Sequence, residues 1–176
     1  MTRRPAAWTL GIFAVIVGFA SLVWALPLED IDHFLRVDAQ VCTGGQPSEA
    51  DLARLAGEGI RTVIDLRERS EHDVDAEAAA AHRLGLGFFS IPVKAADPKD
   101  EDAKAFLEAT ASPEVFPAFI HCGSGNRVGA FWMIRRVLVD GWTVEKAEEE
   151  ARRIGLHSPN LVDFSRDYIQ RHARRD

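Results

Sequence analysis

The sequence has few cysteines and no excess of basic residues, and both shortages exclude common classes of protein. Only Cys42 and Cys122 occur among 176 residues, and neither is followed by His or Cys at a chelating interval. This excludes a disulfide framework and a zinc site of the usual spacing. Lys and Arg number 21 against 27 Asp and Glu, a net charge of −6, so a general nucleic-acid binder is not expected. The length and the 47% hydrophobic content indicate one globular domain with a core of its own.

Charge is absent from residues 5–28, which follow two arginines. The basic start, the apolar centre and the small residues before Ala25 are typical of a secretory signal peptide cleaved after Ala25. The uncharged stretch Trp8–Leu26 nearly reaches the length of a membrane span, so an uncleaved anchor is the alternative. In both cases we expect residues 1–25 to direct the rest of the chain to an exported, periplasmic or other extracytoplasmic location. Cleavage would remove two positive charges and leave a net charge of −8.

Residues 27–176 contain no repeat or linker and are expected to form one domain in which strands alternate with helices. The patterns predict strands over Arg36–Cys42, Ile60–Leu66, Phe88–Val93 and Ala118–Cys122, and helices over residues 48–57, Val74–Leu84, Asp100–Thr110, Val128–Asp140, Val144–Ile154 and Asn160–His172. The predicted fold class is therefore α/β, with a small, mostly parallel sheet flanked by helices and a helical C-terminus. Ligands of such folds bind at the carboxyl ends of the strands.

One segment, with the sequence FIHCGSGNRVGA at residues 119–130, carries the elements of covalent chemistry. A buried strand ends in a glycine loop and a helix follows, so several backbone N–H groups and the positive helix end can face one anion. Arg127 adds a two-pronged donor for tetrahedral oxygens. A cysteine in that positive field is expected to be a thiolate at neutral pH, which makes Cys122 a candidate nucleophile. The predicted anion-binding residues are Gly123, Ser124, Gly125, Asn126 and Arg127.

The loop resembles that of cysteine-dependent protein tyrosine and dual-specificity phosphatases. The wider pattern is similar to the bacterial beta-lactamase-hydrolase-like phosphatase family, through residues 44–47 (GGQP), 62–67 (TVIDLR), 91–93 (IPV) and 121–129. The resemblance implies the cysteine-phosphatase fold and a phosphocysteine intermediate on Cys122. It also implies that Arg127 and the loop amides bind phosphate, and that no metal or other cofactor takes part. The implied substrate is a phosphomonoester, either a phosphorylated protein residue such as phosphotyrosine or a small molecule.

Two features depart from that pattern. Four residues separate Cys122 from Arg127, one fewer than in the usual phosphatase signature, and this spacing is similar to that of rhodanese sulfurtransferases. Val128 stands where phosphatases usually have a Ser or Thr that helps the thiolate leave. A rhodanese-like sulfurtransferase using the same cysteine and a catalytically inactive anion-binding module are therefore the alternatives.

A phosphomonoesterase also needs a general acid for the leaving oxygen. The candidate loop follows the IPV strand, and Asp97, which lies 25 residues before Cys122, is our first choice, with Asp100 as the second. The alternative for Asp97-Pro98 is an ordinary helix N-cap.

Four further side chains are weaker candidates for a role at the site. His121 either tunes the thiolate or is a core histidine, and Gln46 either contacts the catalytic loop or belongs to a turn. Arg67 and Arg69 are candidates to surround the pocket with positive charge, although a solvated loop is the better interpretation for Arg69.

Cys42 has no partner in the sequence except Cys122. One hypothesis is that it traps the oxidised nucleophile as a reversible disulfide. The favoured alternative is that it packs as a small apolar residue.

Overall fold

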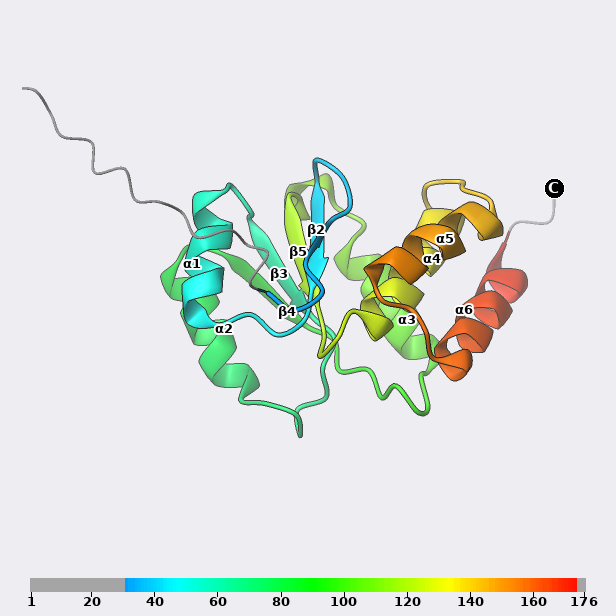
Figure 1. Cartoon of the computed structure of the whole chain (residues 1–176), viewed down its shortest axis with the longest axis horizontal. Coiled ribbons are helices and arrows are strands. Elements are labelled where there is room, and N and C mark those ends of the chain that lie inside the picture. Colours follow the sequence, from blue (N-terminus) through cyan, green and yellow to red (C-terminus); the bar gives the residue numbers. More distant parts are fainter. Residues whose placement is uncertain (1–30, 174–176) are drawn as a thin grey trace, which may run out of the picture.

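The computed structural model describes residues 31–173 (Figure 1). The elements run in the order β1 (Leu35–Arg36), β2 (Val41–Gly44), α1 (Glu49–Gly57), β3 (Thr62–Asp65), α2 (Val74–Arg83), β4 (Gly87–Ser90), α3 (Asp100–Ala109), a short 3-10 turn (Pro113–Val115), β5 (Ala118–His121), α4 (Asn126–Leu138), α5 (Val144–Ile154) and α6 (Pro159–His172). The signal peptide or anchor expected over residues 1–25 lies outside the described part of the chain. None of the helices between residues 31 and 173 has the length and apolarity that a bilayer crossing requires.

The five strands form one sheet in the order β1-β2-β5-β3-β4. Only β1 is antiparallel, against β2, and the other three pairings are parallel. The order places β5 at the centre of the sheet, with Ile120 aligned to Thr43 on one side and to Ile64 on the other. The predicted α/β class with a mostly parallel sheet is confirmed. Because β5 is central, the residues that follow it lie between the loops of its neighbours.

Helices cover both faces of the sheet. Figure 1 shows α1 and α2 on one face and α3 to α6 on the other. Two apolar cores correspond to these layers, one beneath α1 and α2 that contains Leu55 and Phe119, and a larger one that contains Ile120, Phe131 and Trp132. Helix α4 lies at the centre of the larger core and is buried on most of its surface, which fits its apolar sequence. The helix that follows the candidate nucleophile is therefore packed against the core over most of its surface.

Helix boundaries follow the predicted start and stop signals closely. Ser48 and Asp51 form a capping box at α1, and Thr143 caps α5 through the N–H group of Lys146. Helix α4 begins at Asn126, two residues earlier than predicted, because its N-cap Gly125 adopts a left-handed φ of +78°.

Two predicted strands differ from the structure. The single strand expected over Arg36–Cys42 is a hairpin, because Asp38 Oδ1 accepts hydrogen bonds from the backbone N–H groups of Gln40 and Val41 and turns the chain. The strand expected over Phe88–Val93 ends at Ser90. Pro92 has no N–H group, so the regular ladder stops before it.

Candidate active site

The loops that the sequence singled out meet at the carboxyl edge of the sheet. Residues 45–47 follow β2, residues 66–73 follow β3, residues 91–99 follow β4 and residues 122–125 follow β5. A bridge between Gly45 and Ser124 joins the first of these loops to the last. The Gly-Gly-Gln-Pro segment, the Asp-Leu-Arg segment and the His-Cys loop therefore surround one site, as the sequence predicts.

Cys122 lies at the base of this site, one residue beyond the end of β5, and only 1% of it is exposed. Its backbone N–H group donates to Gly44 O at 3.4 Å. The loop then turns through Gly125, where a Cβ atom would lie 2.2 Å from the carbonyl oxygen of Ile154. Only glycine fits there, so the loop is pressed against the turn between α5 and α6. This packing holds the loop amides in place before any ligand arrives.

Arg127, in the first turn of α4, is directed back towards the cysteine. Its Nη1 atom donates to Val93 O at 3.1 Å, and its guanidinium interacts with the Cys122 sulfur. Burial would lower the pKa of this guanidinium, but hydrogen bonding to Glu71 and attraction to Cys122 outweigh burial and raise it. Although only four residues separate Cys122 from Arg127, the arginine still places a permanent positive charge beside the nucleophile.

Glu71 is a site residue that the sequence analysis missed. From the loop after β3, its Oε1 atom lies 2.5 Å from Arg127 Nη1 and its Oε2 atom 2.8 Å from Nη2. The hydrogen bonds from Arg127 lower the pKa of Glu71 to about 2. A carboxylate of such low pKa cannot serve as a general acid near neutral pH. Its position on the outer edge of the guanidinium suits it to hold Arg127 in one orientation.

The two candidates for the general acid lie in different surroundings. Asp97 is exposed in the loop after β4 and pairs with Lys99 at 2.6 Å, and that hydrogen bond lowers its pKa. Asp100 is held by Arg171 of α6 through two hydrogen bonds of 2.6 and 2.8 Å, which lower its pKa as well. The loop of Asp97 is tied to the site through the bond from Arg127 to Val93 O. Asp97 is not the helix N-cap, because Lys99 occupies that position.

A buried cluster of charged side chains lies behind the nucleophile. Arg67, expected at the rim of the pocket, is instead only 1% exposed and pairs with Asp65 at 2.9 Å and with Glu77. The rim assignment was wrong because the alternation of β3 continues past its end and turns this side chain inwards. His121 Nε2 lies 2.9 Å from Glu77 Oε1, and His72 Nε2 lies 2.7 Å from Asp65 Oδ2.

The ligand atoms of Asp65, His72 and Glu77 lie within 4.8 Å of one another, a spacing that could hold a metal ion. However, the Arg67 guanidinium already contacts both carboxylates and supplies the positive charge that a metal would bring. This cluster therefore fits an internal ion pair network better than a metal centre. His121 belongs to this cluster. Its side chain is fully buried and contacts Glu77, so it is a core histidine.

Two other expected site residues have structural contacts. Asn126 Oδ1 accepts hydrogen bonds from the N–H groups of His157 and Ser158 at 3.0 and 3.2 Å, so this side chain braces the loop before α6. Arg69 lies in an exposed loop with its side chain 68% exposed, in agreement with the solvated interpretation.

Cys42 is not placed to react with Cys122. It is aligned with Phe119 in the pairing of β2 with β5, three residues before Cys122. With strands about 4.8 Å apart and a rise of about 3.3 Å per residue, the Cα atoms are roughly 11 Å apart, too far for a disulfide. The two cysteines also belong to different apolar cores. The disulfide-trap hypothesis is therefore wrong, and Cys42 packs as an apolar residue whose pKa is raised by burial.

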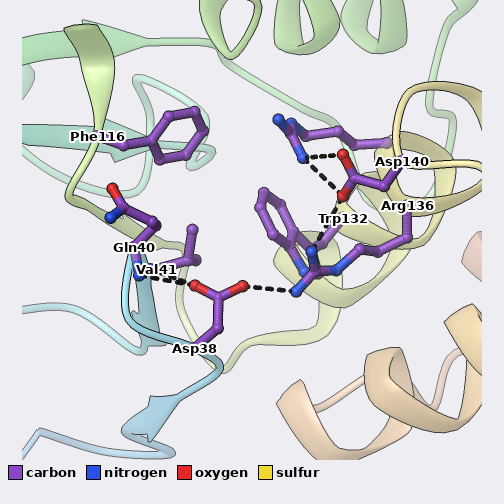
Figure 2. A pocket seen from close by; sticks show the side chains of 8 residues that line it. Asp38, Gln40, Val41, Phe116, Trp132, Arg136 and Asp140 are labelled. Carbon is purple, nitrogen blue, oxygen red and sulfur yellow. Dashed lines mark hydrogen bonds and ion pairs between the residues drawn. The ribbon is translucent and has the colours of Figure 1, made fainter. Parts of the chain in front are cut away.

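A cavity of about 240 Å³ lies at the opposite end of the sheet (Figure 2). Figure 2 shows Asp38 of the hairpin turn and Asp140 on either side of Arg136, beside the ring of Trp132. Arg136 donates to Asp38 at 2.8 Å, to Asp140 at 3.0 Å and to Glu150 at 2.7 Å. These ion pairs join the hairpin to α4 and α5. At a rise of about 1.5 Å per residue, Arg136 lies roughly 15 Å along α4 from Asn126, and the cavity is at the opposite end of the strands, so it is not part of the site.

Comparison with known proteins agrees with this geometry. A family model described as DSP-PTPase phosphatase fused to NAD+ kinase matches residues 27–164. A beta-lactamase hydrolase-like protein of Xylella fastidiosa is 32% identical over 119 residues, which are 65% of this chain and 27% of that protein. The chain thus spans about a quarter of the length of that relative.

Two further similarities extend over more of the chain. The dual specificity protein phosphatase TpbA of Pseudomonas aeruginosa is 24% identical over 97% of this chain and 83% of its own length. A solved structure of TpbA in complex with pTyr has a TM-score of 0.64 and 20% identity, covering 80% of this chain and 86% of that one. A DUF442 protein of Shewanella putrefaciens has a TM-score of 0.73 and 21% identity, covering 84% and 97%. These structures share the fold.

Proposed function

We propose that this chain, which belongs to the family of DSP-PTPase phosphatases fused to NAD+ kinase, is a cysteine-dependent phosphatase that hydrolyses phosphomonoesters through a phosphocysteine on Cys122. The observation that carries the proposal is the contact between Arg127 and the Cys122 sulfur across a loop of only four residues. That contact places a fixed cation where a tetrahedral anion would meet a thiolate, beneath loop amides held by Gly125.

The reaction takes place in two steps. The Cys122 thiolate attacks phosphorus, the S–P bond forms, and the bond from phosphorus to the leaving oxygen breaks. The contact with Lys99 is what lowers the pKa of Asp97, so Asp97 must leave Lys99 for the substrate before it gives its proton to that oxygen. A water molecule then attacks the phosphocysteine and returns a proton to Asp97, and the S–P bond breaks to release inorganic phosphate and the thiolate. Arg127 stabilises the equatorial oxygens in both steps.

Val128 supplies no hydroxyl group to assist departure of the thiolate. The second step therefore depends on Arg127 and on the buried position of Cys122 at the end of β5. We expect this step to limit the rate, so the phosphocysteine should accumulate during turnover.

The experiment that tests the proposal offers the full chain an aryl phosphate and, separately, thiosulfate with cyanide. Phosphate release that is lost in Cys122→Ser and severely reduced in Arg127→Lys, and that is unaffected by chelators, supports the phosphatase. Thiocyanate formation without phosphate release would instead identify a sulfurtransferase. Binding of phosphate without either turnover would identify an anion-binding module.

The same family relationship supports a phosphorylated protein residue, such as phosphotyrosine, as the substrate. TpbA was solved with phosphotyrosine bound, and its similarity covers 80% of this chain. Export through residues 1–25 is a separate proposal, and fractionation of cells that express the full chain tests it. Activity in an extracytoplasmic fraction supports export, and activity confined to the cytoplasm contradicts it.

A further inference from the structure

A second cavity, of about 280 Å³, lies beside the catalytic loop between the starts of α1 and α2. Its lining includes Gln46, which follows the glycine bridged to Ser124, and His72, which follows the Glu71 that holds Arg127. Gln46 and His72 are thus each adjacent in sequence to a residue that contacts Ser124 or Arg127. The cavity therefore opens close to the catalytic loop, where the neighbour of a phosphorylated residue in a peptide substrate could reach it.

The cavity lining carries negative charge. Glu49, Asp73 and Glu77 are among the lining residues, whereas no Lys or Arg of the described chain lines it. Glu77 also pairs with the buried Arg67, and Glu49 pairs with Arg83 at 2.7 Å. Asp73 caps α2 by accepting from Ala76 N at 3.0 Å, which offsets the positive helix end at this point.

His72 lines the cavity with a nearly buried ring. Its side chain is only 5% exposed, and its Nε2 atom lies 2.7 Å from Asp65 Oδ2. A proton must lie between these two atoms, since otherwise two lone pairs would face each other. Nε2 therefore donates to Asp65. Nδ1 is buried and has no hydrogen-bond partner among the described residues.

We propose that this cavity binds a basic side chain, Lys or Arg, next to the phosphorylated residue of a protein substrate. The inference rests on the proposed phosphatase function and specifies its substrate class. The aliphatic stem of such a side chain would pack on Leu52, and its charged head would donate to Asp73 and Glu77. The same lining repels polyanionic phosphate esters, because a second phosphate group would face carboxylates.

The test uses phosphotyrosine peptides in which the residue on either side of phosphotyrosine is Arg, citrulline, Ala or Glu. Citrulline keeps the shape of arginine and removes the charge. We expect kcat/KM of the full chain to be about tenfold or more higher for Arg than for citrulline on at least one side, with Glu lowest. Equal values for Arg, citrulline and Glu on both sides would overturn the proposal.

Matched variants test whether the preference for the Arg peptide arises in this cavity. In Asp73→Asn combined with Glu49→Gln, the ratio of kcat/KM for the Arg peptide to that for the citrulline peptide should fall towards one. Asn at position 73 can still cap α2, so the fold is retained. The control is Glu58→Gln, which removes one negative charge at the C-cap of α1, at a residue that is paired with Arg36 and does not line the cavity, and it should leave the ratio unchanged. An unchanged ratio in the double variant would place the preference elsewhere and refute this cavity as its source.

A binding measurement separates this proposal from the phosphatase itself. Peptide dissociation constants on Cys122→Ser rank the four peptides without turnover, and the Arg peptide should bind most tightly. Cys122-dependent hydrolysis of an aryl phosphate with no charge preference among peptides would defeat only the cavity proposal. Absence of any Cys122-dependent hydrolysis, together with tighter binding of the Arg peptide, would defeat only the phosphatase.

Discussion

Glu71→Gln tests whether the carboxylate that grips Arg127 is part of the catalytic arrangement. The fall in the pKa of Glu71 from 4.5 to about 2 corresponds to about 3 kcal/mol of folding stability before solvent screening is taken into account. The side chain is 36% exposed, and solvent screening reduces this contribution to about 1 to 2 kcal/mol. Because the folded-state pKa is depressed, this stability is complete above pH 4.5 and is lost as the pH falls towards 2.

The effect on activity follows from which edge of the guanidinium Glu71 occupies. Glu71 accepts from Nη1 and Nη2, so phosphate oxygens would bind the edge of the guanidinium that includes Nε. Removal of the charge leaves the guanidinium held mainly by Val93 O. We expect kcat/KM for para-nitrophenyl phosphate to fall about 10- to 100-fold, the equivalent of one or two charge-assisted hydrogen bonds. Glu71→Asp should retain part of the activity.

The assay compares steady-state kinetics and urea unfolding at pH 7 and pH 4 for wild type, Glu71→Gln and the exposed control Glu68→Gln. The difference in unfolding free energy between wild type and Glu71→Gln should be smaller at pH 4 than at pH 7, and Glu68→Gln should resemble wild type. Unchanged or higher kcat/KM in Glu71→Gln would refute the reasoning, since it would mean that Glu71 competes with the substrate phosphate for Arg127.

Three further predictions concern other residues of the site. Asp97→Asn should slow hydrolysis of substrates with poor leaving groups by about 10² while barely affecting activated aryl phosphates, and equal losses on both would exclude Asp97 as the acid. Gly125→Ala places a Cβ atom 2.2 Å from Ile154 O at a left-handed φ, so urea unfolding should show a loss of at least about 2 kcal/mol, and wild-type stability would contradict the packing described for the loop. Cys42→Ala should recover from peroxide with reductant to the same extent as wild type, and a Cys42 to Cys122 linked peptide in mass spectra would contradict the register of β2 and β5.

The central part of the site could be predicted from sequence because its residues are contiguous. The nucleophile, the glycine loop, the arginine and the start of α4 lie within residues 122–129, and strand-loop-helix order fixes their relative placement. The mostly parallel character of the sheet was also accessible, since alternating strands and helices favour a parallel sheet. In the first hairpin the prediction failed because of one local interaction, the turn that Asp38 imposes.

The contacts of Glu71 and His72 could not be predicted in the same way. Both lie in a charged loop, residues 67–73, in which sequence alone does not show which carboxylate turns inwards. Glu71 reaches Arg127 across 56 positions of sequence, and Arg67 is buried only because Asp65 and Glu77 are buried with it. Such pairings depend on the tertiary approach of β3 to β5, which no local pattern encodes.

The most direct measurement of the central claim is rapid-quench analysis of the full chain during turnover of an aryl phosphate. Acid-quenched protein is digested and the peptides are mapped by mass spectrometry. The account predicts a phosphoryl group on the peptide that contains Cys122, formed within the first turnover and absent in Cys122→Ser. Steady phosphate release by wild type with no such adduct, or an adduct on another residue, would contradict it.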